Sequence, residues 1–551
     1  SGLAAQWGGK FKIGEVPFYA FFSEANVPAV SFLYHSMALT SDIMVRFNEW
    51  SPSHYRLFNI QTVVAPAGPD VEVPPFLAPI GQNGRFRIFS APVFSPPGGS
   101  YFEVVDALAS VKTTRNNFYD IDNRWLESDW VIKRIHLLLD WHDDAPPWIP
   151  RMAPEDALSR MPVLPFPGEV KNEQRYGETY RAELDARRLC YALFKMTWHA
   201  NWKAYVDGIP VKTVMLSPGF IGVPLTSGHH QIVCHYEPGR WRGALAIVGF
   251  ITVILLMAGE WRGFAMEPAL AGIRLRGIRP RTDKFPGPRV RREVPRVRRE
   301  VAIACGLVLL AAPVCIPLFT GSVLWGHDGF AYFPRLVEVD QNIAHGVLVP
   351  RWAPDLGRGS GQPLFLFHPP MIYYFGELWR LLGCSFVTAM NLACATVVLA
   401  SAVGMFLLAR LYFGETGGWL GAAAYLYVPY FAVDLYVRSA MEELAAFPFI
   451  ALAMYGFGAF AAGPKSPRAR RYWLIGVAAY TGLLLCHFPA ALLFTPLLLA
   501  FLALTAWMEK SWQVLIKQAL GFVLALGLGA FIWVPALAAR PNSMMNRAVE
   551  G

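Results

Sequence analysis

The residues best suited to chemistry begin at Asp328, in the motif Gly326-His327-Asp328. A carboxylate whose pKa is raised by partial burial could remove a proton from a hydroxyl group as a general base. Arg351 follows, and an arginine can hold a phosphate through two parallel hydrogen bonds. The other candidates in this stretch are His327, Trp352, Asp355, His368, Tyr373 and Tyr374. Because long ordered loops are usually functional, we expect a polar site here.

Two later segments carry ionisable side chains of the same kinds. Arg438, Glu442 and Glu443 lie between two apolar runs, and His487 lies at the end of another. Ionisable groups at membrane depth are costly, so they are candidates for function. Arg438 is an alternative to Arg351 as the phosphate ligand, and Glu442 and Glu443 join Asp328 as candidate catalytic carboxylates.

The same residues could instead have purely structural roles. Glu442 and Glu443 could simply pair with Arg438, and His487 could bond a carbonyl freed at a helix break. Asp328 could cap the start of a helix, and Asp355 could be a plain turn residue.

Membrane-spanning helices are the elements that would position these residues. The 551 residues are 54% hydrophobic and 16% charged, whereas soluble domains carry roughly 25% charged residues. Apolar runs of about 20 residues can cross a bilayer. The sequence therefore predicts an α-helical polytopic membrane protein with about eight spans. These are residues 243–259, 301–320, 386–409, 417–431, 444–462, 472–487, 490–507 and 519–535.

The basic loops predict the orientation of these spans. Residues 262–300 contain twelve basic and four acidic residues, and a second basic loop covers residues 465–471. Loops of this kind face the cytoplasm, so residues 1–242 and the loop 321–384 are predicted on the opposite side. A lipid-headgroup or RNA patch is the alternative interpretation of the linker. Because the net charge of +9 is concentrated in loops beside spans, we expect no nucleic-acid partner.

Residues 1–242 contain no span and predict an extracytoplasmic β-sandwich. Residues 202–214 indicate a hairpin, because Asp207-Gly208 between apolar runs supplies the positive φ angles of a tight turn. Residues 55–64 are also typical of a strand, and residues 178–188 of a helix. The predicted organisation is this domain, a transmembrane helix at 243–259, a basic cytoplasmic linker at 260–300 and a transmembrane domain at 301–551.

Other motifs give weaker signals. The glycines at 357, 359 and 361 lack the spacing of a phosphate-binding loop, so we exclude a nucleotide site. His229, His230 and His235 could bind a metal ion, but their turn and strand positions favour surface histidines. Cys190 and Cys234 could form a disulfide or remain a free buried pair. The chain begins at Ser1 with neither an initiator methionine nor a signal peptide, which is typical of a fragment.

Residues 301–535 resemble bacterial polytopic membrane proteins of the GT-C glycosyltransferase type. The resemblance rests on residues 326–328, on Arg351-Trp352-Ala353-Pro354-Asp355-Leu356-Gly357, on Gly361-Gln362-Pro363, and on Pro369-Pro370 with Tyr373-Tyr374. It is greatest with a domain named for its relation to 6-pyruvoyl-tetrahydropterin synthase, a label that establishes no pterin chemistry. GT-C enzymes place an acidic residue of the first outer loop near a polyprenyl-phosphate sugar, and Asp328 matches that position. Glu442 and Glu443 resemble an acidic position in the second outer loop.

Residues 50–259 are similar to the opposite end of such proteins, in the family related to lipoteichoic-acid and polymer glycosylation membrane proteins. The matching segments are Tyr55-Arg56-Leu57, residues 202–208, Gly222-Val223-Pro224, Gly228-His229-His230 and Tyr236-Glu237-Pro238. A segment that resembles the end of such a protein is thus followed by a segment that resembles the start of one, and the basic linker joins them. This inverted order predicts a fusion of two units whose outer domain and Asp328 belong to different cores.

These resemblances imply transfer of a sugar from a polyprenyl-phosphate donor to an extracytoplasmic glycan, polymer or protein at the bacterial inner membrane. Asp328 would be the base, Arg438 or Arg351 would hold the phosphate, and a divalent metal ion could assist. Trp352, Tyr373 and Tyr374 would stack on the sugar or the isoprenoid chain, among membrane lipids. The competing interpretation is a non-catalytic envelope scaffold or complex subunit with the same frame.

Overall fold

The computed structural model describes residues 47–48, 50–67, 72–84, 86–91, 101–141, 143, 145–160, 164–237, 240–261, 296–320, 326, 328–356 and 360–539. The chain divides into two compact units. The first, called the β-rich unit, draws its described residues from Ser1–Gly239, Phe330–His368 and Pro535–Gly551. The second, called the helical unit, draws them from Arg240–Gly329 and Pro369–Val534.

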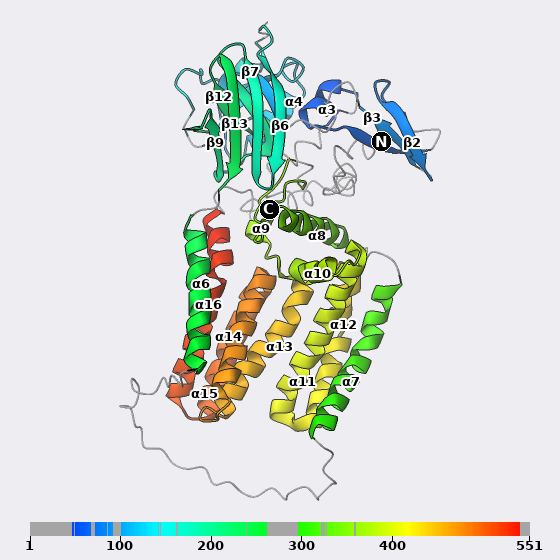
Figure 1. Ribbon diagram of the computed structural model, residues 1–551, viewed down its shortest axis with the longest axis vertical. Helices are drawn as coiled ribbons and strands as arrows, with labels where there is room; N and C mark the ends of the chain where they lie inside the picture. Colours follow the sequence, from blue (N-terminus) through cyan, green and yellow to red (C-terminus); the bar gives the residue numbers. More distant parts are fainter. Residues whose placement is uncertain are drawn as a thin grey trace, which may run out of the picture. The chain divides into compact units, whose positions relative to one another are not determined.

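Three sheets build the β-rich unit (Figure 1). A small sheet has the order β1-β3-β2, a second sheet has the order β10-β9-β13-β7-β6, and β11-β12-β8-β4-β5 form a closed barrel. The strands are β1 (Thr62–Pro66), β2 (Ala78–Asn83), β3 (Phe86–Ser90), β4 (Phe102–Lys112), β5 (Ile135–Asp140), β6 (Gly168–Tyr176), β7 (Thr179–Ala186), β8 (Cys190–Thr197), β9 (Trp202–Val206), β10 (Ile209–Val211), β11 (Val214–Leu216), β12 (Phe220–Leu225) and β13 (Gly228–Tyr236). Short helices α3 (Pro52–Leu57), α4 (Phe118–Leu126) and α5 (Pro154–Leu158) accompany them.

One hydrophobic core joins the five-stranded sheet to the barrel. It contains Tyr180 and Leu184 of β7, Phe194 of β8 and Trp202 of β9, all buried. Side chains on a strand alternate between its two faces, so every second residue of β7 points into this core. The predicted β-rich character of residues 1–242 agrees with this arrangement.

Local sequence signals succeed at the hairpin and fail elsewhere in this unit. Val206 of β9 pairs with Ile209 of β10, and Asp207 and Gly208 adopt φ angles of 52° and 80°, so the predicted hairpin is confirmed. The predicted helix at 178–188 is wrong, because the period-two burial of β7 outweighs the helix propensity of its two alanines and Glu183. The predicted strand at 55–64 is half wrong, since Pro52 starts the helix α3 there.

Residues 330–368 fold as part of the β-rich unit. They include α8 (Gly329–Ala344), which begins just before this stretch, and α9 (Leu364–Phe367). Trp352 is fully buried in the same core as the sheets, with its ring 5.2 Å from that of Trp202 and 4.9 Å from that of Tyr236. The backbone N–H of Thr197 also donates to the carbonyl of Ser360 at 2.6 Å. The inverted order therefore does not keep this loop and the outer domain apart.

The helical unit contains long apolar helices (Figure 1). They are α6 (Arg240–Trp261), α7 (Arg296–Cys315), α10 (Met371–Leu381), α11 (Phe386–Tyr427), α13 (Met441–Ala462), α14 (Ala469–Cys486), α15 (Phe488–Met508) and α16 (Trp512–Ala539). Among the described residues, five stretches are long and apolar enough to cross a membrane: Arg298–Phe319, Phe386–Tyr427, Met441–Ala462, Phe488–Met508 and Trp512–Ala539. The multi-pass character is therefore shown, whereas the predicted count of about eight spans is not confirmed.

The predicted spans 386–409 and 417–431 correspond largely to the two segments of α11, so the apolar stretch Phe386–Tyr427 contains the first and most of the second. Helix α11 is broken at Gly414, whose φ of 72° and ψ of −171° are not helical. Its two segments pack against each other, because the rings of Phe406 and Trp419 lie 5.1 Å apart and a Cβ atom on Gly421 would lie 2.6 Å from that of Ala409. The short helix α12 (Pro429–Ala432) and the π-helical turn η4 (Val433–Arg438) then connect α11 to α13. This connection carries the polar residues described next.

Candidate functional site

A cluster of charged side chains lies at the connection between α11 and α13. Arg438 donates from one terminal nitrogen, Nη1, to Asp434 Oδ1 at 2.8 Å and to Glu443 Oε2 at 2.9 Å. The same nitrogen also donates to the hydroxyl oxygen of Tyr430 at 3.1 Å. The hydroxyl of Tyr430 in turn donates to Glu443. We call Asp434, Arg438, Glu443 and Tyr430 the Arg438 cluster.

The backbone of the connection explains why these side chains meet. The η4 turn places Asp434 and Arg438 four residues apart on one face, and it ends at Ser439, whose φ of 55° and ψ of 40° are left-handed. The N–H of Ala440 then donates to the carbonyl of Asp434 at 2.9 Å, which closes the turn before α13 begins. Left-handed non-glycine residues and π-helical turns are costly and recur at functional sites.

Asp328 lies against this cluster. Its backbone N–H donates to the carbonyl of Arg438 at 2.8 Å. Close packing of Gly326 supports this contact, because a Cβ atom there would clash with the side chain of Ser439 and come within 2.7 Å of the carbonyl carbon of Arg438. The negative charge of Asp328 also contributes to the pKa of Asp434, so the two carboxylates lie within electrostatic reach of one another. Asp328 itself is half-buried and immediately precedes α8.

Asp434 is the most strongly perturbed acid of the cluster. Its side chain is fully buried, and its Oδ2 has no hydrogen-bond partner among the described residues. Burial, followed by the charge of Glu443, raises the pKa of Asp434 to about 7 despite the opposing charge of Arg438. Burial disfavours the charged form of Arg438. The hydrogen bond to Glu443 and the negative charges of Glu443 and Asp434 outweigh burial and raise the pKa of Arg438 above its ordinary value. A carboxyl that titrates near neutral pH is suited to acid–base chemistry.

Glu442 faces a different partner from Glu443. The hydroxyl of Tyr373, at the start of α10, donates to Glu442 Oε1 at 2.8 Å, and both side chains are buried. Of the two predicted glutamates, Glu443 pairs with Arg438 at 2.9 Å, as its structural interpretation expected. Tyr373 is thus held by α13 through its hydroxyl, and its ring has no exposed area for stacking on a ligand in this conformation.

Three predicted substrate ligands have their described contacts within the β-rich unit. Arg351 pairs with Glu178 at 3.3 Å, and Asp355 pairs with Arg175 at 3.5 Å. Trp352 is buried in the core, so its ring is likewise unavailable for stacking on a sugar in this conformation. These contacts fasten the loop to the sheets.

The remaining predicted residues are placed as follows. His487 accepts a hydrogen bond from the N–H of Ala490 at 3.3 Å and so caps α15, rather than bonding a freed carbonyl through that nitrogen. His368 is half-buried at the end of α9, and Tyr374 is half-buried in the first turn of α10. His327 lies outside the described residues. Roles in substrate binding stay predictions for these residues.

The described part of the chain contains no group of three or more His, Cys, Asp or Glu side chains placed to hold a metal ion. His229 pairs with Asp185 at 2.8 Å and His230 with Asp207 at 2.7 Å. Cys190 and Cys234 are free and buried. Participation of a divalent ion stays a prediction.

Asp434 and Tyr430 were missed as site residues by the sequence reasoning. The spacing of four residues between Asp434 and Arg438 is a signal that could have found the aspartate, because this spacing brings side chains together on a helical turn. Tyr430 has no comparable signal, since its contact with Glu443 depends on how α12 meets α13.

Comparison with known proteins gives a family match in the helical part of the chain. Residues 367–533 match the family model described as dolichyl-phosphate-mannose-protein mannosyltransferase. A search of curated proteins found no match, and neither did a search of solved structures. The matched segment contains the Arg438 cluster but not Asp328. Together with the apolar helices, the match supports a multi-pass membrane protein that is similar to glycosyltransferases of the GT-C type.

Proposed function

We propose that this protein transfers a sugar from a polyprenyl-phosphate donor to an acceptor hydroxyl on the extracytoplasmic face of a bacterial inner membrane. The match to the mannosyltransferase family supports the reaction class and the lipid-linked donor. The observation that carries the assignment of residues is the contact between the Asp328 backbone and Arg438. It places the backbone of Asp328, a half-buried residue, beside the backbone of Arg438, whose guanidinium group can bind phosphate.

The proposed reaction is a single inverting displacement. The Asp328 carboxylate takes the proton of the acceptor hydroxyl, whose oxygen then forms a bond to the anomeric carbon of the sugar. The bond from that carbon to the phosphate oxygen breaks, and polyprenyl phosphate leaves with the electron pair. A cation beside the leaving group stabilises the charge that develops there. Arg438 supplies that cation, because guanidinium groups pair well with phosphate oxygens.

Arg438 must be partly released for this role. In the structure its Nη1 donates to Asp434 and Glu443. Protonation of Asp434 would remove one competing charge, and its pKa of about 7 makes the neutral form accessible under ordinary conditions. The buried Oδ2 without a partner favours the neutral form for the same reason. Arg438 would then carry more unbalanced positive charge toward the donor phosphate.

The other parts support this reaction in the proposal. Tyr373 fixes Glu442, the other acidic residue at the start of α13, in one orientation through its hydroxyl. The β-rich unit, in which the five-stranded sheet and the barrel share one core, is proposed to be an extracytoplasmic β-sandwich that binds the acceptor glycan, polymer or protein. A non-catalytic scaffold is the alternative, and the occupation of Arg438 by two carboxylates is the observation that favours it.

The deciding variant is Asp328→Asn, which keeps the size of the side chain but cannot accept the proton. General acid–base catalysis contributes about 10² to 10⁴-fold in rate, so kcat should fall by that order while the protein stays folded. The matched control is Asp129→Asn, at an exposed position of the β-rich unit. Transfer at the wild-type rate by Asp328→Asn would exclude Asp328 as the base, and no transfer by the unsubstituted protein would favour the scaffold.

A further inference from the structure

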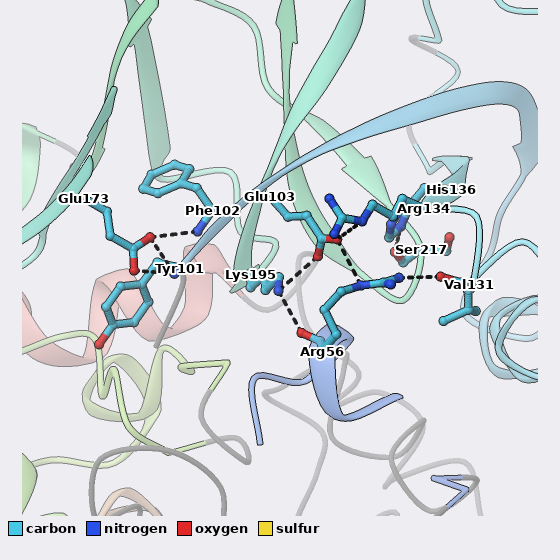
Figure 2. Close-up of polar contacts among 10 residues, drawn as sticks. All are labelled: Arg56, Tyr101, Phe102, Glu103, Val131, Arg134, His136, Glu173, Lys195 and Ser217. Atoms are coloured by element: carbon cyan, nitrogen blue, oxygen red, sulfur yellow. Dashed lines mark hydrogen bonds and ion pairs between the residues drawn. The ribbon is translucent and has the colours of Figure 1, made fainter. Parts of the chain in front are cut away.

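Three cations surround a single carboxylate in the β-rich unit (Figure 2). Glu103, on β4, is paired through Oε1 with Arg56 at 3.1 Å and with Arg134 at 3.0 Å. Its Oε2 lies 3.0 Å from Nζ of Lys195 on β8. No other carboxylate pairs with these three cations in the part of the chain that the structure describes. The group therefore carries two positive charges more than it has negative ones.

Burial makes this surplus costly. The side chains of Lys195 and Glu103 are only 6% and 9% exposed, and that of Arg56 is 18% exposed. Although burial favours the neutral acid, the charges of Lys195, Arg56 and Arg134 lower the pKa of Glu103 to about 2, so its single charge is permanent. The neighbouring His136 adds no charge, because burial lowers its pKa to about 4. Buried charges are normally balanced by partners, so two positive charges of this cluster lack a compensating negative charge within the described residues.

Arg134 holds the open side of the cluster. Its side chain is 31% exposed and uses Nε for Glu103, and within the described residues its Nη groups have no hydrogen-bond partner. Its backbone φ of 58° lies in the left-handed region, which a side chain of this size seldom adopts. Such strain persists where the surroundings require a particular direction of the side chain. The left-handed backbone of Arg134 is compatible with a guanidinium group whose terminal nitrogens face a ligand.

An exposed aromatic ring borders the same arginine. The Arg134 guanidinium carbon lies 5.1 Å from the centre of the Phe166 ring, and that of Arg187 lies 5.4 Å from it. Phe166 is 41% exposed, so part of its surface remains open beside the cations. An apolar surface next to guanidinium donors suits a ligand that joins an anionic group to a sugar ring.

We propose that Arg134, Arg56 and Lys195 form a binding site for an oxyanion, the phosphate or carboxylate group of an anionic glycan. The fork of N–H donors on an arginine matches the oxygens of such groups. Glu103 orders the three cations and balances only one of their three positive charges, so two remain for the oxyanion. That the glycan is the acceptor rests on the function proposed above, whereas the binding of the oxyanion does not.

Binding of radiolabelled inorganic phosphate to the full chain in detergent tests the site, at constant ionic strength. Saturable binding is expected in the unsubstituted protein. Arg134→Gln should weaken it by about tenfold or more, since hydrogen bonds between charged groups are lost. Arg181→Gln, at an exposed arginine of β7, should leave it unchanged. Equal affinities in the unsubstituted protein and in Arg134→Gln, or no saturable binding, would overturn the site.

A second variant makes the opposite prediction. Glu103→Gln removes the internal competitor for the cations, so phosphate should bind more tightly than in the unsubstituted protein and should raise the unfolding temperature of this variant more. If the cluster is only an internal ion pair, Glu103→Gln will be destabilised and phosphate will not restore it. Arg134→Lys, which keeps the charge without the fork, should fall between the unsubstituted protein and Arg134→Gln.

Competition experiments identify the source of the oxyanion. Glucose 6-phosphate should displace labelled phosphate at lower concentration than unlabelled inorganic phosphate does, because its sugar ring can also contact Phe166. Equal potency would mean that the site takes a free ion, which overturns the assignment to a glycan. These measurements require no sugar transfer, so failure of the binding site and failure of the proposed transferase activity are distinguishable.

Discussion

Two carboxylates with different surroundings stand beside Arg438. Asp328 is half-buried and touches the cluster through its backbone, whereas Asp434 is fully buried and paired with the guanidinium. A base must be ionised when the acceptor binds, and we propose Asp328 for that role because it is only half-buried and its backbone holds it beside Arg438. Asp434 is better suited to regulating the charge of Arg438 through its own protonation.

The pH dependence of donor binding follows from Asp434. Its raised pKa means that the carboxyl is neutral below about pH 7 and charged above it, and only the charged form competes with phosphate for Arg438. The KM for the donor should therefore rise, by roughly tenfold, as pH increases through 7. In Asp434→Asn this rise should disappear. Steady-state kinetics across this pH range measure both, and identical pH profiles of KM would contradict this role of Asp434.

At the scale of elements, structure that is decided by adjacent residues could be predicted from the sequence. Structure that is decided by long-range packing could not. The hairpin at Asp207-Gly208 is decided by two adjacent residues and was predicted correctly. Strand β7 was mistaken for a helix, because its place between β13 and β6 is a long-range fact that propensity does not contain. The convergence of Asp328 with Arg438 depends on the close packing of Gly326 against Ser439, which no local pattern reveals.

Gly326 should be indispensable to the geometry of the site. Replacement by alanine puts a Cβ atom against Ser439 and the Arg438 backbone, so the hydrogen bond from Asp328 to Arg438 should lengthen or break. Misplacement by about 1 Å can cost about 10²-fold in rate, and we expect a loss of that order in kcat for Gly326→Ala. Gly527→Ala in α16, where a Cβ atom meets nothing within 4 Å, is the matched control. Equal losses in both variants would show that the close approach of Gly326 is unimportant.

Trp352 should fasten the loop 330–368 to the sheets. Truncation of a buried tryptophan to alanine costs about 3 to 5 kcal/mol, so Trp352→Ala should lower the unfolding temperature of the full chain markedly. Trp148→Ala, at a side chain that is 63% exposed, should change it little. Thermal unfolding monitored by protease resistance of the β-rich unit provides the measurement. An unchanged unfolding temperature in Trp352→Ala would mean that the loop is not anchored there.

At the scale of the whole molecule, composition predicted the membrane character, and the resemblance predicted the GT-C type. The predicted number of spans is not confirmed, because five stretches of the described residues are long and apolar enough to cross a membrane, although one of them, Phe386–Tyr427, covers most of two predicted spans on either side of Gly414. The membership of residues 330–368 in the β-rich unit was also missed. Sequence order separates Trp352 from its partner Trp202 by a linker and two predicted spans, so only their packing in three dimensions joins them.

The orientation across the membrane stays a prediction and can be measured directly. We expect the β-rich unit on the extracytoplasmic side and the basic loop at 465–471 in the cytoplasm. Cysteines introduced at the exposed positions Ser159 and Leu348 should react with an impermeant reagent added from outside, and one at exposed Ser466 should not. The unsubstituted chain gives the background from native cysteines. Reaction at Ser466 alone would reverse the orientation.

Release of polyprenyl phosphate from a polyprenyl-phosphate sugar is the reaction that distinguishes a transferase from a non-catalytic scaffold. The full chain in lipid vesicles is incubated with the labelled donor and a glycan acceptor, and the released lipid and the labelled glycan are quantified together. The account predicts equal amounts of both products from the unsubstituted protein, and a decrease of about 10² to 10⁴-fold for Asp328→Asn. Product formation by Asp328→Asn at the unsubstituted rate, or none by either protein, would contradict it.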